Sequence, residues 1–145
     1  MVAQSVDRMS MRPGPTSVLS RLLLVDDDQA LLDALSGTLK ARFGHFSLDT
    51  CDSGVKALDL AKRQHYDTII VDVNMPRMNG FEVLAAVKKL QPQTPVLLIS
   101  GHADEAMMVR AIEEGASAVL PKPFDREEFV QTVRRTLQVS ASRRA

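Results

Sequence analysis

Apolar and polar positions follow a regular order along the chain. Five short apolar runs alternate with longer stretches in which apolar residues recur every three or four positions. The short runs predict strands at residues 22–25, 46–50, 68–71, 96–99 and 118–120. The longer stretches predict five helices, which begin near Asp28, Ser53, Gly80, Asp104 and Asp125. Asp and Ser are favoured caps at helix N-termini, which supports four of these starts.

Strands that alternate with helices favour a parallel sheet covered by helices on both faces, which is an α/β doubly wound fold. The run at 46–50 alternates in polarity, and Pro121 cannot donate a ladder hydrogen bond, so we expect the second and fifth strands at edges. Residues 1–20 predict a flexible N-terminal tail and residues 140–145 a short C-terminal tail, which leaves one domain at 21–139.

Composition narrows the class of protein. The formal net charge of the 145 residues is zero, so we expect no direct binding to nucleic acid or to a membrane surface. The single cysteine, Cys51, excludes an internal disulfide and fits a reducing compartment. No apolar run is long enough to cross a bilayer, and the N-terminus lacks the apolar core of a signal peptide. We therefore expect a cytoplasmic protein.

Polar side chains follow four of the five predicted strands. The first strand ends at Asp26 and Asp27, the third at Asp72, the fourth at Ser100, and the fifth just before Lys122. The carboxyl ends of parallel strands share one edge of the sheet, where doubly wound folds bind their ligands. Carboxylates without His or Cys favour a hard cation such as Mg²⁺. A nucleophilic carboxylate beside a hydroxyl and an ammonium group indicates phosphoryl transfer through an aspartyl phosphate.

These residues lie within four recognisable motifs. The motifs are Leu-Val-Asp-Asp-Asp at 24–28, Val-Asp-Val-Asn-Met-Pro-Arg-Met-Asn-Gly at 71–80, Ile-Ser-Gly-His at 99–102 and Leu-Pro-Lys-Pro-Phe at 120–124. Taken in this order, each at a strand end, they resemble the receiver domain of two-component response regulators, of the stand-alone chemotaxis type. The resemblance covers roughly residues 20–139.

The resemblance implies a flavodoxin-like sheet with strand order 2-1-3-4-5 and a role for each motif residue. Asp72 would accept a phosphoryl group from a histidine kinase or phosphotransfer protein. Mg²⁺ would be held by Asp26, Asp27, Asp72 and the backbone carbonyl of Asn74. Ser100 would bond a phosphoryl oxygen, and Lys122, preceding a cis peptide bond to Pro123, would form an ion pair with the phosphate.

One position departs from the family pattern. Receivers usually carry Tyr or Phe three residues before the lysine, where this chain has Val119. In the family that aromatic ring turns inward as the hydroxyl residue moves, and so signals to the face formed by the fourth helix, fifth strand and fifth helix. Val119 cannot do this, so we expect output through the loop after Ser100 and the helix that follows it. His102, in that loop, is expected to be an exposed residue beside the path of attacking water.

The resemblance also bears on output and on competing functions. We expect a signalling phosphoacceptor with weak autophosphatase activity rather than a metabolic enzyme. Its output would be partner binding or onward relay without an output domain, as a monomer or weak homodimer. An alternative is a small Mg²⁺-dependent aspartyl-phosphate phosphatase, but such enzymes usually have a second acid where this chain has Asn74. A receiver that binds partners without phosphorylation, or a nucleotide-binding flavodoxin-like protein, fits the motifs less well.

Overall fold

The protein folds around a five-stranded parallel sheet. The computed structural model describes the backbone of residues 20–144 and the side chains of residues 20–142, so residues 1–19 of the tail predicted at 1–20 lie outside the described residues. The strands are β1 (Ser20–Val25), β2 (Phe46–Cys51), β3 (Thr68–Asp72), β4 (Val96–Ser100) and β5 (Ala118–Pro121). Their order is β2-β1-β3-β4-β5, and all neighbouring pairs are parallel. The predicted fold class, strand order and edge strands are confirmed.

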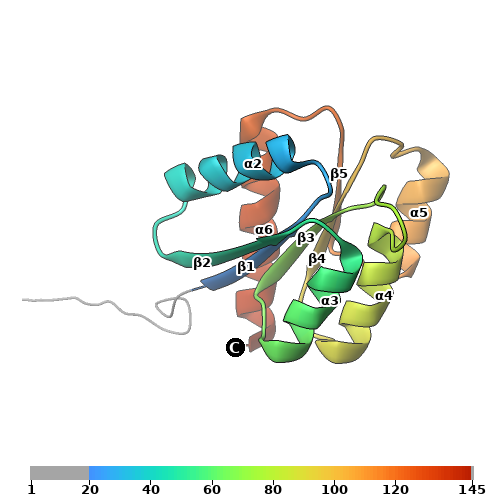
Figure 1. Cartoon of the computed structure of the whole chain (residues 1–145), viewed down its shortest axis with the longest axis horizontal. Coiled ribbons are helices and arrows are strands. Elements are labelled where there is room, and N and C mark those ends of the chain that lie inside the picture. The colour runs from blue at the N-terminus through green and yellow to red at the C-terminus, as the bar shows by residue number, and fades with distance from the viewer. Residues whose placement is uncertain (1–19, 145) are drawn as a thin grey trace, which may run out of the picture.

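Five helices cover the sheet on both faces. They are α2 (Gln29–Arg42), α3 (Gly54–Arg63), α4 (Gly80–Leu90), α5 (Glu105–Glu113) and α6 (Arg126–Arg144). Figure 1 shows α2 and α6 on one face and α3, α4 and α5 on the other. Successive side chains of a strand point to opposite faces, so Leu22 and Leu24 pack with α2 and α6, whereas Leu23 and Val25 pack with α3 and α4.

Local chemistry sets the helix starts that the sequence predicts. The side chains of Asp28, Ser53 and Asp104 each accept a hydrogen bond from a backbone N–H of the first turn. Asn79 and Glu82 form a reciprocal capping box at the start of α4. Asp125 and Glu128 exchange the same pair of bonds at the start of α6, at 2.8 and 3.1 Å.

The structure differs from the sequence expectations at three places. Val55 and Ile112 belong to the apolar positions that recur along the predicted helices, but they are 60% and 73% exposed. Helix α6 continues to Arg144, so residues 140–144 are helical instead of forming a separate tail, because no Gly or Pro interrupts the helix after Arg126. Strand β1 begins at Ser20, which the sequence placed in the N-terminal tail. None of the helices in the described part of the chain has the length and apolar character that crossing a bilayer requires.

Candidate functional site

Asp72 lies at the carboxyl end of the central strand. All five residues of β3 are buried, and Asp72 itself is 3% exposed. Helix α4 begins directly behind it, because Gly80 lets the two backbones meet: a Cβ atom there would lie 2.7 Å from the carbonyl oxygen of Asp72. The amide of Gly80 also donates to the carbonyl of Val73 at 2.9 Å. The carboxylate is therefore held on a tightly packed backbone.

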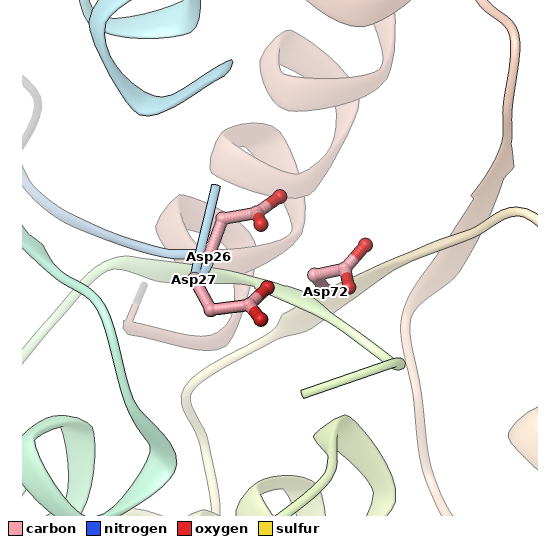
Figure 2. A group of neighbouring side chains, drawn as sticks. All are labelled: Asp26, Asp27 and Asp72. Carbon is pink, nitrogen blue, oxygen red and sulfur yellow. The ribbon is translucent and has the colours of Figure 1, made fainter. Parts of the chain in front are cut away.

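Two further carboxylates face Asp72 from the end of β1. Figure 2 shows the side chains of Asp26, Asp27 and Asp72 as neighbours at this edge of the sheet. One oxygen from each lies within 4.8 Å of the others, and Asp27 is the exposed member. The fold thus brings the predicted acid cluster together from two strand ends that are far apart in the sequence.

The environment of Asp26 suits a bound cation. Asp26 is 2% exposed, and its Oδ1 accepts a hydrogen bond from the amide of Asp28 at 2.9 Å. Its Oδ2 is buried without a hydrogen-bond partner. Burial raises the pKa of Asp26 to about 6, opposed by the Asp28 amide and reinforced by the charge of Asp72. A hard cation would satisfy the orphaned oxygen and favour the ionised carboxylates, so the three acids fit Mg²⁺.

Lys122 supplies the opposite charge. Its Nζ lies 2.8 Å from Oδ1 of Asp72, an oxygen that has no well-directed hydrogen bond and depends on this ion pair. Burial lowers the pKa of Lys122, but close contact with the Asp72 carboxylate outweighs burial and leaves this pKa raised. The peptide bond between Lys122 and Pro123 is cis, as the resemblance implied.

Ser100 and Asn74 complete the surroundings of Asp72. Ser100 is 1% exposed, and its Oγ accepts a hydrogen bond from the amide of His102 at 3.0 Å. The carbonyl of Ser100 accepts from the amide of Lys122 at 2.8 Å, which ties the ends of β4 and β5 together. The amide of Asn74 donates to Oδ2 of Asp72 at 3.1 Å. Its carbonyl stays a predicted metal ligand.

An open depression of about 610 Å³ adjoins these residues. Asn74, Ser100 and the exposed His102 line one part of it, and Phe81 and Arg110 line another. Sequence reasoning missed Phe81 and Arg110. The available signal was the charge of Arg110 within the apolar stretch of α5, but a residue on α4 could not be paired with it from the sequence.

Two residues that the sequence singled out lie outside this cluster. Val119 is half-buried and packs against the core between the sheet and helices α3 to α5, where it holds a place that an aromatic ring usually takes in the family. Cys51 is half-buried at the end of β2, and burial raises the pKa of its thiol to about 11. At neutral pH the thiol is therefore protonated and poorly reactive.

Known proteins resemble this chain in sequence. The chain matches the family model of the response regulator receiver domain over residues 22–134. It is 35% identical over 113 residues to the cell cycle response regulator CtrA of Brucella ovis and of Brucella abortus, which is 78% of this chain and 48% of those proteins. The chain therefore spans about half the length of these curated relatives.

Solved structures agree with the sequence match. The chemotaxis protein CheY4 of Vibrio cholerae is 31% identical, with a TM-score of 0.76 over 82% of this chain and 99% of that chain. A CheY-like receiver domain from Methanospirillum hungatei JF-1 is 24% identical, with a TM-score of 0.79 over 86% of this chain and 98% of that chain, and shares the fold. With the family match over residues 22–134, the chain belongs to the response regulator receiver family of two-component systems.

Proposed function

We propose that Asp72 accepts a phosphoryl group from the phosphohistidine of a histidine kinase or phosphotransfer protein, and that phosphorylation changes the protein's binding to a partner. The observation that carries this proposal is the placement of Asp72. It is a buried carboxylate at a strand end, beside two further acids and 2.8 Å from an ammonium group. A nucleophile, a cation site and a counter-charge are the parts that phosphoryl transfer to a carboxylate needs.

In the proposed reaction an Asp72 carboxylate oxygen attacks the phosphorus of the donor. The new O–P bond forms as the P–N bond breaks, and the departing imidazole nitrogen keeps the electron pair and takes up a proton. Lys122, which forms an ion pair with Asp72, would then form an ion pair with the phosphoryl oxygens. The Ser100 hydroxyl, whose oxygen accepts from the His102 amide, would donate a hydrogen bond to a phosphoryl oxygen.

The acids Asp26, Asp27 and Asp72, with the Asn74 carbonyl, would hold Mg²⁺. The ion would neutralise charge between the carboxylates and the phosphoryl oxygens. Asp26 is buried and offers the orphaned Oδ2, whereas Asp27 is open to solvent, so the two acids have different environments. Water would hydrolyse the acyl phosphate slowly, which gives the weak autophosphatase activity of a timed signal. The alternative of a small aspartyl phosphatase has less support, because Asn74 stands where such enzymes usually carry their second acid.

We further propose that output leaves the site through α5, towards the face made of α5, β5 and α6. A chain of hydrogen bonds runs that way. The amide of His102 donates to Ser100 Oγ at 3.0 Å, the amide of Asp104 to the His102 carbonyl at 3.0 Å, and the amide of Met107 to Asp104 Oδ1 at 2.9 Å. Val119→Phe is expected to leave partner binding unchanged. An effect on affinity confined to the phosphorylated state would contradict this route.

The acceptor is tested with a small phosphodonor. The full chain is incubated with Mg²⁺ and acetyl phosphate, and the intact mass is recorded before and after mild base. We expect one phosphoryl adduct that base removes and that chelation of Mg²⁺ prevents. Asp72→Ala should give no adduct, whereas Asp59→Ala, which changes an exposed carboxylate on α3, should behave as the wild type. An adduct that persists in Asp72→Ala would contradict the proposal.

A further inference from the structure

Helix α5 is weakly attached to the rest of the domain. Of its nine residues only Ala111 is fully buried, while Val109 and Ile112 are 49% and 73% exposed. It nevertheless follows β4 and Ser100 directly, so it stands closest in sequence to the hydroxyl that would bind the phosphoryl group. A helix with so little buried surface can shift at small cost.

One long side chain joins α5 to the neighbouring helix. The guanidinium carbon of Arg110 lies 3.8 Å from the centre of the Phe81 ring, on α4. The Nε of Arg110 is 2.6 Å from Oε2 of Glu114, but both side chains of this ion pair are largely exposed, at 55% and 37%. The exposed ion pair contributes little, and the Arg110 side chain remains 55% exposed although it lies over the buried Phe81 ring, so Arg110 can exchange these contacts for a stronger partner.

Arg110 also borders the depression beside the site. The lining of that depression includes Ser100, Asn74 and His102, and it contains no carboxylate. Arg110 is therefore the one residue of the lining with a permanent charge. Asp72 itself does not line the depression, but the next two residues, Val73 and Asn74, do. Phosphorylation would replace the single negative charge of the Asp72 carboxylate with a phosphoryl group of about −1.5 to −2 beside this space. An arginine fork matches phosphoryl oxygens in shape and charge.

Val119 on β5, where receivers usually carry an aromatic ring, has a short side chain that packs against the core and does not line this depression. We propose that Arg110 is a positioning residue that turns from Phe81 and Glu114 towards the phosphoryl group on Asp72 and thereby shifts α5. This inference rests on the proposed phosphorylation of Asp72. The cationic side chain of Arg110 would then transmit phosphorylation to α5, in place of the aromatic ring that receivers usually carry on β5.

The first test observes Arg110 directly. The full chain, labelled uniformly in nitrogen and labelled in carbon on its phenylalanine rings, is titrated with beryllofluoride and Mg²⁺ and followed by NMR. We expect the Arg110 Nε–H and the Phe81 ring signals to move with the same midpoint as the amides of Asn74 and Ser100. If those amides respond while Arg110 and Phe81 stay unchanged, the inference is wrong. If no signal responds in the wild type, the phosphorylation proposal itself fails.

The second test uses matched variants. Arg134 on α6 also stacks on a phenylalanine, with its guanidinium carbon 5.0 Å from the centre of the Phe43 ring, and Phe43 belongs to the core on the opposite face of the sheet. We expect Arg110→Met to weaken beryllofluoride binding about tenfold, which is near the lower end for a hydrogen bond between charged groups. Arg110→Lys should restore part of this affinity and Arg134→Met should lose none. Equal affinities of Arg110→Met and Arg134→Met would overturn the inference.

Discussion

Helices α4 and α5 occupy equivalent places in the fold but differ in how firmly they are held. Each follows a strand that ends in a site residue, Asp72 for α4 and Ser100 for α5. Helix α4 buries Gly80, Phe81, Val83, Leu84 and Val87 and begins with a capping box. Helix α5 buries one residue and is capped by a single side chain, that of Asp104. Asp72 is therefore followed by a firmly packed helix, whereas Ser100 is followed by a helix with little buried surface, which can shift more easily.

The largest expected effect comes from shortening a buried side chain of α4. Leu84 is fully buried, so Leu84→Ala should lower the free energy of unfolding by about 2–5 kcal/mol. The matched change on α5, Ile112→Ala, removes a side chain that is 73% exposed and should change stability by less than about 0.5 kcal/mol. Urea denaturation measures both. Similar losses in the two variants would remove the contrast between the helices.

The contact between α4 and the acceptor strand predicts the next effect. A Cβ atom on Gly80 would lie 2.7 Å from the Asp72 carbonyl oxygen and 2.8 Å from the Val73 Cα. Gly80→Ala should therefore cost about 1–3 kcal/mol through overpacking and should lower phosphorylation by displacing Asp72. Gly37→Ala is the control, because a Cβ there meets no atom within 4 Å. In the middle of α2 it should stabilise by roughly 0.5–1 kcal/mol. If Gly80→Ala were phosphorylated like the wild type, the packing of α4 against the backbone of Asp72 would not be needed to position the acceptor.

The elements and the site could be predicted from the sequence because they depend on local pattern and topology. Helix caps such as Ser53 and Asp104 act within one turn, and the ends of parallel strands must share an edge. Burial on the helices was less predictable. Val55 and Ile112 fit an apolar period, yet the fold leaves both exposed, because the sheet contacts only part of each helix. The pairing of Arg110 with Phe81 joins two helices and has no local signature.

Asp26, the buried acid next to Asp72, predicts a smaller effect on the free energy of unfolding, and this effect depends on pH. The pKa of Asp26 is raised to about 6 from 3.8, so the folded state favours the protonated acid. The stability that this provides is complete below about pH 4 and is lost as the pH rises through 6. Without Mg²⁺, Asp26→Asn should therefore be more stable than the wild type by about 1–2 kcal/mol at pH 8 and equal to it near pH 4. Thermal unfolding across this range would show the difference, and an equal gain at both pH values would contradict it.

Added Mg²⁺ should reverse this order at pH 8. The ion stabilises the folded wild type by mass action, and loss of the Asp26 carboxylate weakens that binding. Asp26→Asn should consequently show a smaller rise in melting temperature with Mg²⁺ than the wild type. An equal rise in the melting temperature of both proteins would mean that Mg²⁺ binds without the Asp26 carboxylate.

The most direct test of the account measures hydrogen exchange in both helices before and after phosphorylation. The full chain is treated with Mg²⁺ and acetyl phosphate, and peptides covering residues 80–90 and 105–113 are compared. We expect phosphorylation to change exchange in α5 and to leave α4 unchanged, and we expect Asp72→Ala to abolish the change. A change of equal size in α4, or a change in α5 that persists in Asp72→Ala, would contradict it.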